Sequence, residues 1–227
     1  MDESSINISI IGHIRSDFPE KFGIPRQSGR IKKLRSVIVL DGKYKSPEAL
    51  RGLEGFSHLW VLWIFSQTPI GKWSPTVRPP RLGGNRRMGV FATRSPYRPN
   101  PIGMSALEIE KIDPEKGEIT VLGGDILDGT PIIDIKPYLP SADRIDNAIG
   151  GFADGALSHR LNVELGDKVG GILSKDEQDL ICDILADDPR PSYQNDPDRI
   201  YGMDYADISV KFKVNGNDLT IIEIEKH

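Results

Sequence analysis

Short apolar runs follow one another through the first 140 residues, and turn residues separate them. Expected strands cover residues 6–14, 37–40, 58–65, 88–92, 104–112, 118–124 and 131–138. A short helix is expected at 46–52, because Ser46 suits a cap and Pro47 suits the first helical position. The sequence has neither long amphipathic helices between these strands nor a G-x-G-x-x-G loop. The pattern therefore predicts a β-barrel or sandwich rather than alternating strands and helices.

The pattern weakens after residue 141 and then changes character. Ser174 and Glu177 have the spacing of a capping box, and the apolar helical face behind them ends at Asp188. Two further strands, 207–214 and 218–225, are joined by a hairpin signal. We therefore expect a mainly β protein with a β domain over 1–141, a connection over 142–165 and a small α+β domain over 166–227.

Two long loops, 15–36 and 67–87, are rich in basic side chains and in the proline and glycine of ordered loops. The net charge of −4 hides an asymmetry, since residues 1–107 hold 17 Lys and Arg against 7 Asp and Glu. Residues 108–227 hold 12 Lys and Arg against 26 Asp and Glu. No acidic residue lies between Glu54 and Glu108. A local basic patch favours a polyanion such as RNA. The alternative is chance clustering that the acidic half balances.

Two segments carry candidate chemistry. The loop 89–103 presents Arg94 and Arg98 between prolines, which restrict the backbone before any anionic ligand binds. On residue types alone, a rigid connecting loop with solvated arginines remains an alternative. Asp128-Gly129 is typical of a turn between strands, and the aspartate also offers oxygens to hydroxyl or ammonium groups. From this turn alone, the plain hairpin is the favoured interpretation.

Other classes of site find little support in the sequence. The lone cysteine, Cys182, lies in an apolar helical pattern and is interpreted as a core thiol. The histidines lack metal-ligand spacing, so no metal is expected. Apolar runs fall short of the ~18 residues of a membrane helix, and a signal peptide is not indicated. We expect a cytoplasmic protein.

Four segments give the sequence a family resemblance. They are KFGIPRQSG (21–29), LEGFSHLW (53–60), RPPRLGGNRRMGVFATRSPYRPNPIGMS (78–105) and LDGTPIIDIKPYLP (127–140). They resemble the TrmO (YaeB, TsaA-like) family of tRNA N6-threonylcarbamoyladenosine methyltransferases. The resemblance is close over residues 6–141 and reaches the tail through DPRPSYQ (188–194) and Tyr201-Gly202.

The resemblance implies a single-sheeted β-barrel that binds S-adenosylmethionine near a homodimer interface. It also implies N6-methylation of threonylcarbamoyladenosine at position 37 of tRNA, next to the anticodon. The implied cofactor contacts are Pro25, Arg26, Gln27, Ser66, Gln67, Arg94, Met104, Leu127, Asp128, Gly129 and Thr130. Relatives commonly have histidine at the position of Ser66, so only a main-chain contact would survive that difference.

The expected RNA contacts are Lys72, Arg86, Arg87 and Arg98, with Tyr97 or Trp73 stacking on an exposed base. The adenine N6 is a poor nucleophile that must lose a proton, so a general base or a water path is expected. Asp128 is a candidate base by chemistry only, and the catalytic residue stays unassigned. A homodimer is also expected from Trp60 and Trp63 in the apolar run 58–65.

Two other functions remain open at this point. One is a methyltransferase with the same barrel that acts on another RNA or on a small molecule. The other is a non-catalytic module that binds S-adenosylmethionine or RNA. The intact motifs around Arg94 and Asp128 favour an enzyme, and the charge asymmetry favours RNA.

Overall fold

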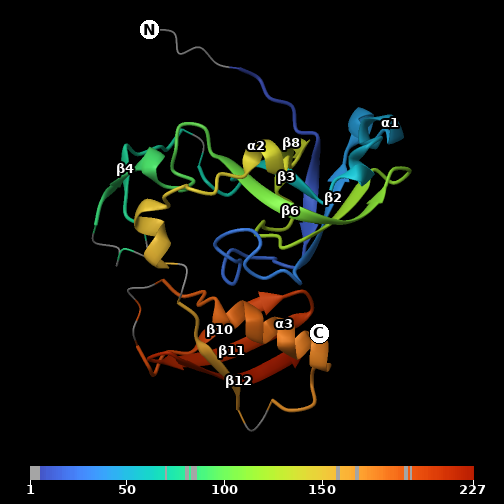
Figure 1. Ribbon diagram of the computed structural model, residues 1–227. Helices are drawn as coiled ribbons and strands as arrows, with labels where there is room; N and C mark the ends of the chain where they lie inside the picture. Colours follow the sequence, from blue (N-terminus) through green and yellow to red (C-terminus); the bar gives the residue numbers. More distant parts are fainter. Residues whose placement is uncertain are drawn as a thin grey trace.

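A computed structural model describes residues 6–69, 71–79, 82, 86–156, 159–166, 169–191, 194 and 196–227. Figure 1 shows a barrel above a smaller sheet domain, with the loop that precedes β2 between them. Apolar side chains form one core inside the barrel and a second core in the smaller domain. Mainly β structure with a small α+β C-terminal unit confirms the predicted fold class.

Six strands close into a single barrel. They are β1 (Gly12–Ser16), β2 (Arg35–Leu40), β3 (His58–Ile64), β6 (Ile102–Asp113), β7 (Glu118–Leu122) and β8 (Pro131–Pro137). Their spatial order is β1-β2-β7-β6-β3-β8, and every neighbouring pair is antiparallel. Alternation places Leu59, Val61 and Trp63 of β3 in the core. Closure leaves this sheet without a free edge.

Short elements connect the barrel strands. They are η1 (Gly42–Tyr44), α1 (Pro47–Leu50), η2 (Leu53–Gly55), β4 (Thr76–Val77), β5 (Met88–Gly89) and η4 (Val90–Ala92). Two more, α2 (Pro140–Asp143) and η5 (Gly151–Ala156), follow the last barrel strand and lead to the C-terminal domain. The expected helix at 46–52 is present as the single turn α1, with Pro47 at its start. β4 and β5 pair with each other across the loop between β3 and β6.

The C-terminal domain is a four-stranded sheet with one helix. Its elements are β9 (Asn162–Leu165), α3 (Lys175–Ala186), β10 (Tyr201–Tyr205), β11 (Ile208–Asn215) and β12 (Asp218–Lys226). The strand order is β10-β11-β12-β9, and only β9 is parallel to its neighbour. The expected capping box is present, since Ser174 and Glu177 each accept a hydrogen bond from the other's backbone. Ile181, Ile184 and Leu185 of α3 join the apolar core of this domain.

Two strand predictions differ from the structure, and two strands of the C-terminal domain were not predicted. The first strand begins at Gly12 rather than at residue 6, and Ile6, Ile8 and Ile10 are exposed, because β2 ends at Leu40 opposite Gly12. The expected strand 88–92 stops at Gly89 and continues as a turn of 3-10 helix. β9 lies within the expected connection, and β10 was not expected.

The loop over residues 17–34 belongs to both halves of the molecule. Phe18, Ile31 and Leu34 are buried in the C-terminal core although they precede β2 of the barrel. Gly23 adopts a φ of +96°, and a Cβ there would lie 2.6 Å from the sulfur of Met203. A glycine is therefore required for the 17–34 loop to lie this close to β10.

Candidate functional site

A cavity of about 620 Å³ opens at one end of the barrel. Its wall combines residues from the 17–34 loop, the end of β3, the loop that leads into β6, and the segment between β7 and β8. Trp63, Phe65 and Ile102 supply apolar surface. A cavity of this size suits a small-molecule ligand or a nucleoside.

Most of the predicted cofactor residues converge on this cavity although they are far apart in sequence. The lining residues include Pro25, Arg26, Gln27, Ser66, Gln67, Arg94, Met104, Leu127 and Thr130. Ser66 and Gln67 follow β3 directly, and Met104 lies on the adjacent strand β6, so the barrel itself brings them together.

Asp128 and Gly129 lie outside the cavity wall and are exposed. The Asp128 carboxylate accepts a hydrogen bond of 2.9 Å from the backbone amide of Ser16 at the end of β1. Gly129, in the turn before β8, has a φ of +70°. Glycine adopts this backbone conformation far more readily than other residues. Both residues therefore lie in a turn, but the turn is not the hairpin expected from the sequence, because β7 and β8 are not neighbours in the barrel.

Two arginines of the loop 89–103 face the cavity. The guanidinium of Arg94 donates a hydrogen bond to the amide oxygen of Gln27, which ties this loop to the 17–34 loop. Arg98 donates to the backbone oxygen of Thr93 at 3.2 Å and also lines the cavity. Arg98 was expected to contact RNA, and its position fits a ligand inside the cavity as well.

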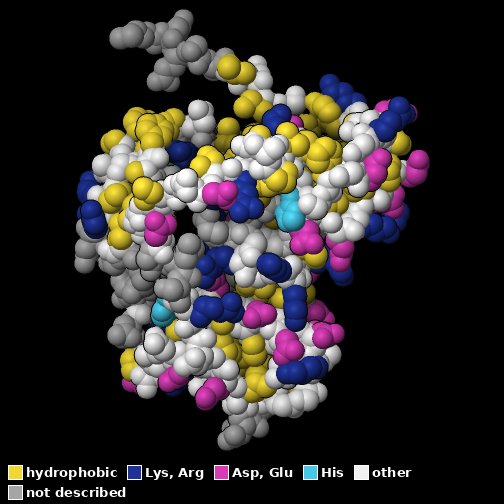
Figure 2. Space-filling view, viewed as in Figure 1, with side chains coloured by type: hydrophobic (Ala, Val, Ile, Leu, Met, Phe, Trp, Pro, Cys, Tyr) yellow, Lys and Arg dark blue, Asp and Glu magenta, His cyan; other side chains and the backbone are white. Residues whose placement is uncertain are grey.

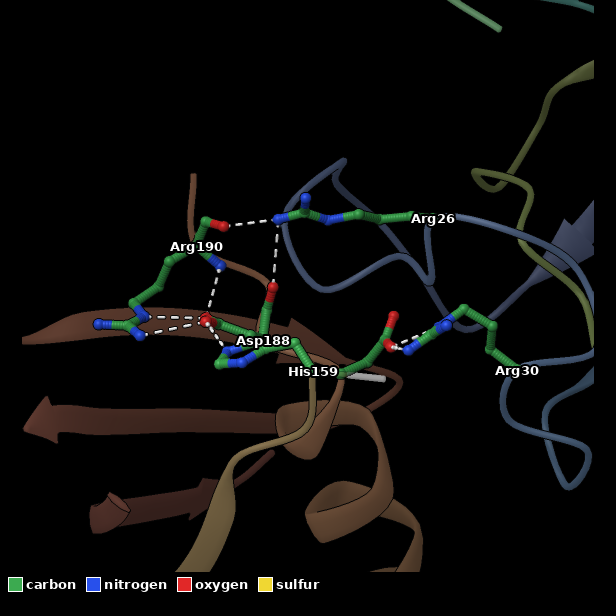
Figure 3. Close-up of polar contacts among 6 residues, drawn as sticks. Arg26, Arg30, His159, Asp188 and Arg190 are labelled. Carbon is green, nitrogen blue, oxygen red and sulfur yellow. Dashed lines mark hydrogen bonds and ion pairs between the residues drawn. The ribbon is translucent and has the colours of Figure 1, made fainter. Parts of the chain in front are cut away.

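The guanidinium of Arg26 connects the cavity wall to the C-terminal domain. It donates hydrogen bonds to the backbone oxygens of Asp188 at 3.3 Å and Arg190 at 2.6 Å (Figure 3). Arg30 of the same loop forms an ion pair with Asp187. The C-terminal domain thus holds the loop that carries Pro25, Arg26 and Gln27.

Those contacts are made by a segment of the C-terminal domain that is held together by its own polar contacts. Arg190 is buried and donates to the Asp188 carboxylate at 2.8 Å, and His159 lies 3.2 Å from the same carboxylate (Figure 3). Burial alone would raise the pKa of Asp188, but the hydrogen bonds from Arg190 and His159 outweigh it and lower the pKa. Of the tail motif 188–194, residues 192 and 193 lie outside the described residues.

Asp125 is a cavity residue that the sequence did not reveal. Its carboxylate accepts a hydrogen bond of 2.6 Å from the hydroxyl of Ser105, which accepts one of 3.1 Å from the indole of Trp63. Burial raises the pKa of Asp125 to about 6, although Ser105, backbone amides and Arg94 act in the opposite direction. Only the fold distinguishes this aspartate from Asp128, three residues further on.

Replacing Asp125 with asparagine is expected to stabilise the protein at neutral pH. The folded-state pKa of about 6 lies above the ordinary value of 3.8, so the wild type loses stability as pH rises through this interval. Asparagine does not ionise and avoids that loss. Urea unfolding should show an advantage of about 1–3 kcal/mol at neutral pH that disappears near pH 4. An advantage independent of pH would contradict this assignment.

Trp63 forms part of the cavity wall because its partner on β6 is a glycine. Trp63 and Gly103 are opposite each other in the β3–β6 pair, and a Cβ on Gly103 would lie 2.3 Å from the indole ring. Trp60 packs against Tyr138 with ring centroids 5.5 Å apart. Both tryptophans thus have partners within one chain, so they do not by themselves require a dimer.

The expected RNA contacts Lys72, Arg86 and Arg87 are exposed and lie outside the cavity wall. Three large exposed aromatic side chains, Trp73, Phe91 and Tyr97, are on the same group of loops. Backbone hydrogen bonds from Ser74 to Tyr97 and from Val90 to Pro75 hold these loops together. Figure 2 shows hydrophobic and basic side chains together over the loops around β4. Arg81 lies outside the described residues.

Two absences hold for the described part of the chain. No helix there is long and apolar enough to cross a membrane. No group of three or more His, Cys, Asp or Glu side chains there is placed to hold a metal ion.

Comparison with known proteins gives one consistent result. The tRNA-methyltransferase O N-terminal domain matches residues 13–144, and the TrmO C-terminal domain matches residues 158–227. A tRNA (adenine(37)-N6)-methyltransferase of Escherichia coli is 42% identical over 98% of this chain and 99% of its own. A putative S-adenosylmethionine-dependent methyltransferase of Pseudomonas aeruginosa is 43% identical over 94% of each chain. The crystal structure of TrmO from P. aeruginosa superposes with a TM-score of 0.82 at 34% identity, covering 100% of this chain and 99% of that one.

Proposed function

This chain belongs to the tRNA-methyltransferase O family, and we propose that it methylates tRNA with S-adenosylmethionine as methyl donor. The proposed target is N6 of threonylcarbamoyladenosine at position 37, next to the anticodon. The observation that carries the proposal is the convergence of nine expected cofactor residues on one cavity at the end of the barrel. An enzyme acting on tRNA would work in the cytoplasm.

The cavity fits S-adenosylmethionine in size and chemistry. Its volume of about 620 Å³ lies in the range that holds ligands of this size. Lys21, Arg26, Arg94 and Arg98 line it, and an arginine can pair with the carboxylate of the methionine part. Trp63 and Phe65 offer apolar surface to a purine ring. When bound, the donor supplies a methyl group on a positively charged sulfur.

The exposed basic and aromatic side chains around β4 fit the anticodon stem-loop. Lys72, Arg86 and Arg87 can neutralise phosphates, while Trp73 and Tyr97 are placed to stack on unpaired bases. A backbone hydrogen bond from Ser74 to Tyr97 connects this surface to the loop that carries Arg94. A bound anticodon loop would therefore lie next to the cavity.

We also expect a homodimer. Phe91 exposes 75% of its surface, and a second subunit would remove part of this apolar surface from water. Sedimentation at micromolar concentration should show twice the chain mass of 25.2 kDa. A fully active species of single-chain mass would contradict this expectation.

A methyl-transfer assay with two tRNA preparations tests the proposed function. Purified protein is incubated with methyl-labelled S-adenosylmethionine and tRNA that carries or lacks the threonylcarbamoyl group. Label is expected only in the modified tRNA. Equal label in both preparations would indicate a different RNA target, and binding of donor and tRNA without any transfer would indicate a non-catalytic module.

A further inference from the structure

We propose that Asp125 is the catalytic base of this site and accepts the proton that leaves N6 during methyl transfer. The inference rests on the proposed function, because it assigns a role within that reaction. It differs from the expectation for Asp128, whose carboxylate is bound to the Ser16 amide on the exposed side of the turn.

Asp125 is the one carboxylate among the described residues that line the cavity. The other ionisable groups in that lining are Lys21, Arg26, Arg94 and Arg98, all of which are cations. Lysine and arginine ordinarily titrate far above neutral pH and cannot take up a proton there. Of the described lining side chains, only Asp125 can therefore act as a base near neutral pH.

A chain of hydrogen bonds fixes the orientation of this carboxylate. Ser105 is buried on β6, and its hydroxyl donates to Oδ1 of Asp125 while accepting from Nε1 of Trp63. Trp63 is held against Gly103 by the β3–β6 pairing. The base is thus attached to two barrel strands, which limits its motion relative to the residues that line the cavity.

The chemical step balances with one base. The N6 lone pair forms a bond to the methyl carbon, and the carbon–sulfur bond breaks with its electron pair left on sulfur. The N6 proton moves to an oxygen of Asp125, which becomes a neutral carboxylic acid. Water then takes this proton from Asp125 and restores the carboxylate. No oxidant or metal is needed.

The environment of Asp125 suits this role. Burial raises its pKa to about 6, so the group is ionised at neutral pH and still holds a proton better than an exposed aspartate does. Arg94 acts on it electrostatically and favours the ionised form. A base with a pKa near the working pH is the efficient case in proton transfer.

The test compares wild type with Asp125→Asn, Asp125→Glu and the control Asp134→Asn. Asp134 on β8 forms a surface ion pair with Lys136 and lies outside the cavity wall. Single-turnover rates are measured with saturating donor and threonylcarbamoyl-modified tRNA from about pH 5 to about pH 8. Calorimetry measures binding of S-adenosylmethionine to each variant, and thermal unfolding confirms that each one is folded.

The wild-type rate should fall about tenfold per pH unit below the pKa of the base. Asp125→Asn should lose about 100-fold to 10,000-fold in rate at neutral pH. Its rate should also lack the fall at low pH, which is the acid limb of the pH profile. Its affinity for S-adenosylmethionine should stay within about threefold of wild type, a difference that corresponds to less than about 1 kcal/mol of binding free energy. Asp125→Glu should keep the acid limb with a smaller loss of rate, and Asp134→Asn should match wild type.

Three results would overturn the proposal. One is a folded Asp125→Asn variant with the wild-type rate. Another is an unchanged acid limb in that variant, which would assign the proton to a different group. A third is a loss of donor affinity as large as the loss of rate, which would make Asp125 a binding residue. A wild type that transfers no methyl group would instead refute the proposed function itself.

Discussion

Replacing Arg94 with alanine is expected to weaken binding of S-adenosylmethionine by roughly tenfold to a hundredfold. The guanidinium lies in the cavity wall and already forms a hydrogen bond to Gln27, so its position is defined before the ligand binds. A hydrogen bond to a charged group contributes about 1.5–3 kcal/mol, and about 1.4 kcal/mol corresponds to a factor of ten. Calorimetry with the purified protein measures this difference.

Arg87→Ala is the matched control for that experiment. Arg87 also carries a guanidinium, but it is exposed, contacts Thr76 and lies outside the cavity wall. Its loss should leave donor affinity within about threefold of wild type. Equal affinities for wild type and Arg94→Ala would remove Arg94 from the binding site.

Replacing Lys72, Arg86 and Arg87 together with alanine should reduce the dependence of tRNA binding on salt. Each phosphate contact contributes a slope of about −0.9 on duplex and about −0.7 on single-stranded nucleic acid. An anticodon stem-loop presents both, so the slope should flatten by roughly two to three units. Donor affinity should change by less than about threefold, because these side chains are outside the cavity wall.

A second triple variant separates RNA contacts from general charge effects. Lys116, Lys136 and Lys211 each form a surface ion pair with an acidic neighbour, and such pairs contribute about 0–1 kcal/mol. Alanine at these three positions removes the same charge and should leave the salt slope unchanged. If both triple variants kept the wild-type slope, the loops around β4 would not be the RNA surface.

Local sequence patterns predicted most of the barrel strands but left a barrel and a sandwich open, and the family resemblance implied the barrel. β6 is long enough for alternation between core and solvent to be visible in part of its sequence, whereas β3 is recognisable as a continuous apolar run. β9 was missed because it is four residues long and pairs in parallel with β12, more than fifty residues away. The run from Ile6 to Ile10 looked like a strand, but no barrel strand extends far enough to pair with it.

The sequence predicted those site residues that belong to recognisable motifs, and it did not predict the others. Arg94 and Gln27 come from separate motifs, and the structure brings them into contact. Asp128 was conspicuous because it precedes a glycine turn, whereas Asp125 follows two glycines and has no comparable signal in the sequence. Its position inside the cavity depends on Ser105 and Trp63 of two other strands. Contacts of this kind arise from tertiary packing and leave no local periodicity.

Mass spectrometry of tRNA nucleosides tests the central claim most directly. Total tRNA is prepared from cells that lack the gene and from the same cells that carry it again on a plasmid, and the nucleosides are compared. The account predicts that N6-methylated threonylcarbamoyladenosine is absent without the gene, that unmethylated threonylcarbamoyladenosine accumulates, and that the plasmid restores the methylated form. Methylated threonylcarbamoyladenosine at the normal level in cells without the gene would contradict it.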